Sequence, residues 1–134
     1  MKKYYSSSKT YVADSKIKNA GRGVFAKEDI KKNELIEICP VILAPRSDFS
    51  NLKESLFVTY FFYFGRKKDQ MAIALGFGSV YNHSYSPNAK YKIDTKEKTI
   101  SFYAIENINK DEEITFNYSA GNPKNKNPLW FEVR

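Results

Sequence analysis

The stretch ALGFGSVYNHSYSPNA, residues 74–89, decides how the rest of this sequence is interpreted. It holds two glycines, one proline, two asparagines and His83, which is the only histidine in the chain. These residue types occur where the backbone turns sharply and leaves its own polar groups available. Apolar, strand-like sequence lies on both sides of the stretch. A dense polar turn between such strands predicts the floor of a binding or catalytic site.

The composition predicts one globular domain. The chain has 134 residues, of which 42% are hydrophobic, enough to bury a core and to argue against disorder. Aromatic residues make up 16% of the chain and either fill the core of a β-rich domain or line a channel.

The net charge of +7 has two explanations. A lysine-rich solvated surface accounts for it, and attraction to nucleic acid is the alternative. No arginine-rich run or helix–turn–helix pattern supports the alternative. The charge does not exclude a basic substrate, because the local charge at the site decides what binds there.

Cys39 is the only cysteine, so the chain cannot form an internal disulfide, and with one histidine no zinc cluster or other metal site is expected. A small buried apolar side chain is the favoured role for Cys39. A Cys39–His83 nucleophile–base pair is the alternative, but neither residue has a supporting glycine-rich or acidic context. No apolar run has the length of a membrane span or a signal peptide. We therefore expect an intracellular, cytoplasmic protein without membrane contact.

Short apolar runs bounded by turn residues predict strands. They are expected over residues 10–13, 24–26, 35–43, 71–75, 90–94, 99–105 and 114–118. A short helix is expected from Ser47 to Leu56, and the aromatic run 57–64 is expected to be a buried strand or a turn into one. Many short strands without strand–helix alternation predict a mostly β domain.

Two segments resemble each other. AKEDIKKNELI at residues 26–36, the first repeat segment, is similar to AIENINKDEEI at residues 104–114, the second repeat segment. Both are expected to form strand, polar turn and strand, and Asn33 and Asp111 suit the tight turn position. Shared turn chemistry explains the similarity as well as a duplication does.

Three motifs follow one another in the chain: GRGVFA at 21–26, YNHSYSPN at 81–88 and DEEITFNY at 111–118. In this order and spacing they resemble the motifs of SET-domain lysine methyltransferases. The second is similar to the family's Asn-His-Ser-x-x-Pro-Asn and the third to its Glu-Glu-Leu-Thr-Tyr-Asp-Tyr. Each motif alone is weak evidence, whereas all three over residues 10–118 are specific. The resemblance is closest to the short stand-alone SET proteins of bacteria and large DNA viruses.

This resemblance implies a SET-domain (β-clip) fold of several small sheets. It also implies a C-terminal pseudoknot, in which the third motif passes under the loop formed by the segment before it. The domain is expected over residues 10–118, after a flexible N-terminus at 1–9. The cysteine-rich segments that flank many SET domains are absent, so the tail at 119–134 is expected to close the cofactor and lysine site, with a second subunit as the alternative.

The resemblance implies S-adenosylmethionine as methyl donor and a protein lysine as acceptor. Gly21, Arg22 and Gly23 would lie against the methionine end of the cofactor, where glycine permits close backbone approach. Asn82 and His83 would hold its amino group and adenine. A histidine, with a pKa of about 6.5, poorly matches a lysine of about 10.4, so His83 is not expected to act as the base.

Four aromatic residues complete the expected site. Tyr118 would orient the lysine amine and also contact the polarised methyl group of the cofactor, and Phe116 would leave room for two or three methyl groups. Tyr60 aligns with a tyrosine near the cofactor, with Tyr63 as the alternative if the register shifts. Trp130 would stack on the adenine, or else pack the tail onto the core.

The sequence therefore predicts S-adenosylmethionine-dependent N-methylation of lysine on a protein, with a histone or another basic protein as substrate. The sequence leaves open whether the protein forms a homodimer. It also leaves open a location in the host nucleus, if the protein is viral or secreted. A catalytically inert SET-like module that docks on nucleic acid or chromatin is the alternative, although Tyr118, Asn82 and His83 are all retained. A hydrolase using Cys39 or His83 would lack a nucleophile elbow and a paired base.

Overall fold

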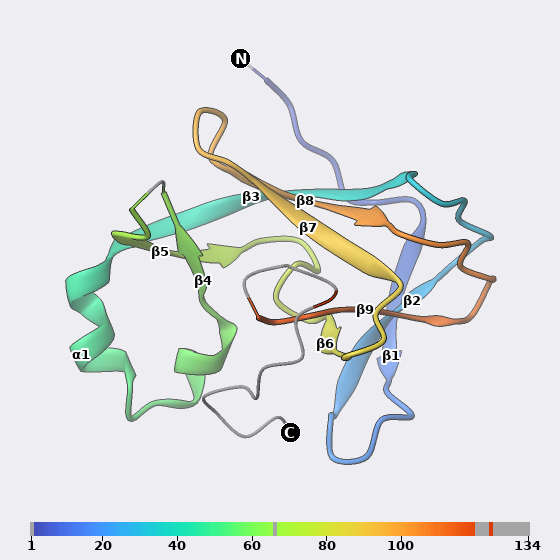
Figure 1. The fold of residues 1–134 in the computed structure, drawn as a ribbon, viewed down its shortest axis with the longest axis horizontal. Helices are drawn as coiled ribbons and strands as arrows, with labels where there is room; N and C mark the ends of the chain where they lie inside the picture. The colour runs from blue at the N-terminus through green and yellow to red at the C-terminus, as the bar shows by residue number, and fades with distance from the viewer. Residues whose placement is uncertain (1, 66, 120–123, 125–134) are drawn as a thin grey trace.

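The described residues form two β-sheets with very little helix (Figure 1). The structure is a computed structural model that describes residues 2–65, 67–119 and 124. Its strands are β1 (Thr10–Asp14), β2 (Arg22–Ala26), β3 (Leu35–Pro45), β4 (Phe62–Phe64), β5 (Gln70–Ala74), β6 (Asn82–His83), β7 (Ala89–Asp94), β8 (Thr99–Ala104) and β9 (Glu113–Phe116). The strand orders are β1-β2-β9-β6 and β4-β5-β3-β8-β7. The expected mostly β fold of several sheets is confirmed.

The long strand β3 joins two parts of the five-stranded sheet. Its first half, Leu35–Pro40, pairs with β8, and its second half, Val41–Pro45, pairs with β5. The register shifts between Leu35 and Glu37, as in a β-bulge, which changes which side chains point inward. Beyond the bulge, Cys39 has no exposed surface and lies in the hydrophobic core, as the sequence predicted.

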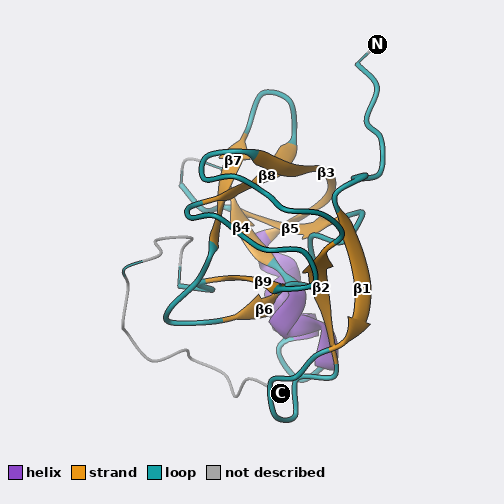
Figure 2. Ribbon diagram, turned by 90° about the vertical axis from the view of Figure 1, so that its right-hand side faces the viewer, coloured by secondary structure: helices purple, strands orange, loops and turns teal. Residues whose placement is uncertain are grey.

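Strand β9 brings the three sequence motifs together (Figure 2). It lies between β2, which starts in the first motif, and β6, which belongs to the second motif. β9 runs antiparallel to β2 and parallel to β6, where Asn82 pairs with Thr115 and His83 pairs with Phe116. Segments far apart in the sequence therefore meet at one edge of the four-stranded sheet.

The two repeat segments pair with each other. Ile30 donates its backbone N–H to the carbonyl of Ile108 at 2.8 Å, and Ile108 donates back to Ile30 at the same 2.8 Å. The turn residues Asn33 and Asp111 adopt matching left-handed conformations, with φ of 71° and 69°. Asparagine and aspartate tolerate this conformation better than other non-glycine residues. The predicted turn positions are confirmed, and the sequence similarity corresponds to a structural repeat.

The segment from residue 46 to 64 lacks the single helix expected from Ser47 to Leu56, whereas the aromatic run 57–64 is a turn that leads into a strand, one of its two expected forms. It consists of η1 (Arg46–Asp48), α1 (Phe49–Leu52), η2 (Leu56–Tyr60) and β4. No side-chain cap begins α1, and Ser55 adopts an extended conformation, so the helix does not continue to Leu56. Figure 1 shows this segment at the opposite end of the molecule from β1 and β2. No helix in the described ranges is long and apolar enough to cross a membrane.

Candidate active site

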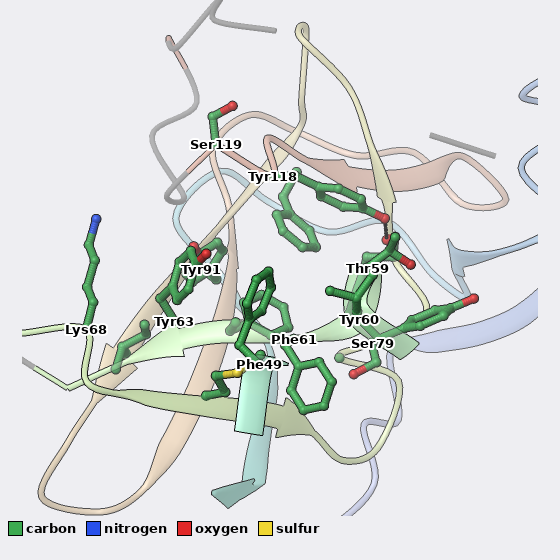
Figure 3. Close-up of a pocket in the computed structure, with 17 residues that line it drawn as sticks. Phe49, Thr59, Tyr60, Phe61, Tyr63, Lys68, Ser79, Tyr91, Tyr118 and Ser119 are labelled. Carbon is green, nitrogen blue, oxygen red and sulfur yellow. Dashed lines mark hydrogen bonds between the residues drawn. The ribbon is translucent and has the colours of Figure 1, made fainter. Parts of the chain in front are cut away.

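An aromatic pocket of about 340 Å³ opens where η2 and β4 face β9 (Figure 3). Its walls include residues from η2, β4, β5, β7 and β9. The aromatic residues among them are Phe49, Tyr60, Phe61, Phe62, Tyr63, Tyr81, Tyr91, Phe116 and Tyr118. Phe62, Tyr81 and Phe116 also belong to or pack against the buried core. The many aromatic residues of the chain therefore lie both in the core and in the lining of a cavity, the two locations that the composition predicted.

Tyr118 reaches this pocket with both of its polar groups fixed. Its phenol hydroxyl donates to the backbone carbonyl of Tyr81 at 2.5 Å. Its backbone N–H donates to Nδ1 of His83 at 3.0 Å. These two bonds tie the end of the third motif to the second motif, so the phenol oxygen has a defined position in the pocket wall.

Phe116, the last residue of β9, forms part of the same wall and precedes Tyr118 by two residues. Only 3% of Phe116 is exposed, and its ring centre lies 5.1 Å from that of Tyr118. It also contacts Tyr81 edge to face at 6.1 Å. The side chain therefore offers a purely apolar surface next to the tyrosine hydroxyl.

Asn82 connects all three motifs through its side-chain amide. Its Nδ2 donates to the Arg22 carbonyl at 3.0 Å and to Oε2 of Glu113 at 2.8 Å. The other oxygen of Glu113 accepts from the Ser15 hydroxyl at 2.7 Å. A Cβ at Gly23 would lie 2.5 Å from Oε2 of Glu113 and 2.9 Å from Nδ2 of Asn82, so a larger residue would displace these side chains and disturb the network.

His83 is held as a neutral side chain. Because Nδ1 accepts the backbone N–H of Tyr118, the ring proton must lie on Nε2. Nε2 is buried and has no hydrogen-bond partner in the part of the chain that the structure describes. Desolvation by burial also lowers the pKa of His83. A neutral ring whose only donor is unpaired is suited to binding an acceptor on a ligand, rather than to deprotonating a lysine.

The lowered pKa of His83 predicts a pH-dependent stability. In the unfolded chain His83 binds a proton at its ordinary pKa near 6.5, whereas in the folded chain it does so only at lower pH. Protonation therefore favours the unfolded chain, and folding stability must fall as the pH drops through 6.5. The effect should be isolated, because the chain has no second histidine. We expect the melting temperature to fall between pH 7.5 and 5.5, and to fall less in His83→Gln. Equal slopes in the two proteins would contradict this assignment.

Two features of the described site leave groups available to a ligand. Gly21 has φ of +75°, and no atom lies within 4 Å of where its Cβ would be, so the backbone there is open to a ligand. The unpaired Nε2 of His83 supplies a second, buried contact point. No group of histidine, cysteine or carboxylate residues in the described ranges could hold a metal ion.

The structure brings most of the expected site residues together. Tyr118 belongs both to the pocket and to the motif network, through His83. Tyr60 and its alternative Tyr63 both line the pocket, so the pocket does not decide between the two registers. Gly21 is exposed and contributes backbone only, and Trp130 lies outside the described residues.

The residues that sequence reasoning missed include Tyr91 of β7, which lines the pocket. They also include Glu37 of β3, a buried carboxylate outside the pocket lining that accepts a hydrogen bond from the Tyr81 hydroxyl. The sequence does indicate that Glu37 is buried. Residues two positions apart in a strand point to the same face, and Cys39 points into the core. No comparable signal marked Tyr91, because alternation along a strand does not show which cavity a side chain lines.

The mostly β fold, with a pocket where distant segments meet, defines a small ligand-binding or catalytic domain. Comparison with known proteins agrees with this description. Residues 21–119 match the family model of the SET domain. The histone-lysine N-methyltransferase specific for H3 lysine-37 of Schizosaccharomyces pombe is 33% identical over 112 residues, covering 84% of this chain and 71% of the relative. The chain therefore belongs to the SET-domain family.

Solved structures support the same assignment. A Plasmodium falciparum protein that carries the name of a histone methyltransferase is 35% identical, with a TM-score of 0.66, covering 83% of this chain and 93% of that one. The Polycomb Repressive Complex 2 of Chaetomium thermophilum, bound to S-adenosylmethionine, matches at 24% identity with a TM-score of 0.70. That match covers 87% of this chain and 16% of the other, and it bears on the fold alone. SET methyltransferases use S-adenosylmethionine, so the expected cofactor and class of enzyme agree with the family.

Proposed function

We propose that this protein transfers a methyl group from S-adenosylmethionine to the side-chain amine of a lysine on a protein substrate. The observation that carries the proposal is the position of Tyr118. Its hydroxyl is fixed by the Tyr81 carbonyl in the wall of an aromatic pocket, beside the network that joins the three motifs. An amine that enters this pocket meets two oriented oxygen atoms, the phenol of Tyr118 and the carbonyl of Tyr81.

The aromatic walls prepare the substrate amine. A lysine ammonium in water has a pKa near 10.4, and only the neutral amine is a nucleophile. Removal of water by side chains such as Tyr60, Tyr91 and Phe116 disfavours the charged form and lowers that pKa. Alignment of the amine by Tyr118 then contributes through positioning, which can supply on the order of 7–11 kcal/mol in favourable cases.

The motif network is the proposed cofactor site. When bound, S-adenosylmethionine supplies a methyl group on a positively charged sulfur. We assign its binding to the backbone of Gly21, Arg22 and Gly23, and to the amide oxygen of Asn82. His83 donates its unpaired Nε2–H, and Tyr60 closes the site from η2. Trp130, as a further proposal, covers the adenine from the tail.

Histone H3 is the first substrate to test. The relative from Schizosaccharomyces pombe acts on H3 lysine-37, and one third of the aligned residues are shared with it. The net charge of +7 does not oppose this choice, because the described pocket walls are mainly uncharged and contain a single charged side chain, Lys68.

Incubation of the protein with radiolabelled S-adenosylmethionine tests the proposal. Core histones, isolated H3 and an unrelated basic protein serve as acceptors, and mass spectrometry of the labelled product identifies the residue. We expect label on lysine, with H3 preferred over the unrelated protein. If the protein binds S-adenosylmethionine but labels no lysine, the proposal is wrong and the inert binding module takes its place.

Phe116 is proposed to set the number of methyl groups. Its ring lines the pocket beside Tyr118 and carries no hydroxyl, so a partly methylated amine would meet no polar group there that prevents it from rotating and reacting again. A hydroxyl introduced by Phe116→Tyr would lie there and bind the amine or a water molecule. We expect wild type to give di- or trimethyllysine and the variant to give mainly monomethyllysine, measured by mass spectrometry of one peptide. Unchanged product ratios would contradict this role.

A further inference from the structure

Glu37 is a buried carboxylate for which the proposed chemistry has no use. It lies on β3 at the end of the register shift that begins at Leu35, and only 5% of it is exposed. Both oxygens are occupied: Oε1 accepts the Tyr81 hydroxyl at 2.7 Å, and Oε2 accepts the backbone N–H of Phe77 at 2.9 Å. Burying a charged group is costly unless it is fully hydrogen-bonded. Both bonds lead into the stretch 74–89.

The backbone around residue 76 is shaped to receive this carboxylate. Gly76 adopts φ of +64°, and a Cβ there would collide with Oε2 of Glu37. Both the left-handed conformation and the close approach favour glycine at this position. Glu37 thus holds the stretch at two points, Phe77 and Tyr81, four residues apart.

Tyr81 links Glu37 to the pocket. Its side chain is 1% exposed and its ring stacks on Phe102 with centres 4.5 Å apart. Its hydroxyl end binds Glu37, and its backbone carbonyl accepts the hydroxyl of Tyr118. Burial and the neighbouring Glu37 carboxylate raise the pKa of Tyr81 well above its ordinary value, so the hydroxyl keeps its proton and remains a donor.

We propose that Glu37 is a positioning residue for methyl transfer, acting through Tyr81 on the hydroxyl of Tyr118. The carboxylate fixes the far end of the Tyr81 side chain, the stacked ring transmits that constraint, and the backbone carbonyl of Tyr81 then holds the phenol. This inference rests on the proposed function, since it names what aligns the residue that orients the amine. Glu37 itself touches neither substrate nor cofactor in this scheme.

The test uses Glu37→Gln and Tyr81→Phe, each of which removes part of the link while preserving shape. Gln can accept one of the two hydrogen bonds but presents an NH₂ group to the other donor. We expect kcat to fall roughly tenfold in each variant, with KM for peptide and S-adenosylmethionine changed less than about twofold, because alignment rather than binding is lost. Glu34→Gln, which alters an ion pair with Lys9, and Tyr103→Phe are the matched controls.

Two further measurements separate positioning from general destabilisation. In a Tyr118→Phe background, Glu37→Gln should have no additional effect on the single-turnover rate. Full additivity, or unchanged kcat in both single variants, would overturn the inference. In protein carrying ¹³C-labelled tyrosine, the signal that Tyr118→Phe abolishes should shift in Glu37→Gln and not in Glu34→Gln. The NMR result decides the link even if wild type transfers no methyl group, which would refute only the proposed function.

Discussion

Replacement of Tyr118 with phenylalanine is expected to lower kcat for lysine methylation about 100-fold, the effect of removing one pre-oriented polar group from an active site. The ring would remain in the pocket wall, while the hydroxyl that Tyr81 holds at 2.5 Å would be lost. The backbone bond from Tyr118 to His83 does not involve the hydroxyl and should persist. Affinity for S-adenosylmethionine should therefore change little.

Steady-state kinetics on a histone H3 peptide, with calorimetry for the cofactor, would measure both quantities. Tyr103→Phe is the matched control, because Tyr103 lies on β8, does not line the pocket, and contacts Lys92 instead. The control should retain wild-type kcat. A Tyr118→Phe enzyme with kcat within threefold of wild type would show that the hydroxyl does not orient the amine.

The sequence carried most of the information about the strands, because alternation and turn residues are local signals. The tight turns at Asn33 and Asp111 could be predicted from residue type alone, and both have positive φ. Local signals failed over residues 47–56, where one helix was expected and only α1, Phe49–Leu52, forms. Phe49 lines the aromatic pocket, and such long-range contacts add to the missing cap in limiting the helix.

The arrangement of the site could not be predicted from local patterns. Strand β6 consists of Asn82 and His83 only, and two residues have no measurable period. Its parallel pairing with β9 is nevertheless what places Asn82 beside Glu113 and His83 beside Tyr118. The motifs predicted which residues belong to the site, through the resemblance to a family. The network that connects them, including the buried carboxylate of Glu37, became visible only in the structure.

Asn82 is the residue whose loss should damage both stability and cofactor binding. It is 7% exposed, and its Nδ2 satisfies the Arg22 carbonyl and the Glu113 carboxylate together. Asn82→Ala would leave Glu113 short of one donor in a half-buried position. Hydrogen bonds to charged groups contribute more than neutral ones, so we expect the free energy of unfolding to fall by about 2–4 kcal/mol. Asn51→Ala, at an exposed position of α1, should change it by less than about 0.5 kcal/mol.

The cofactor response of Asn82→Ala distinguishes a structural from a binding role. A ligand present at 100 times its Kd stabilises a folded protein by about 2.7 kcal/mol, so S-adenosylmethionine should raise the melting temperature of wild type. If Asn82 also binds the cofactor, this increase should be absent in Asn82→Ala, at a temperature where the variant is still folded. If the variant is destabilised but shows the full increase, Asn82 only joins the three motifs, and the amino group of the cofactor must be held by other groups. Loss of the increase in Asn51→Ala as well would point to a general effect on folding. The two readouts together decide whether the second motif builds the site, binds the ligand, or does both.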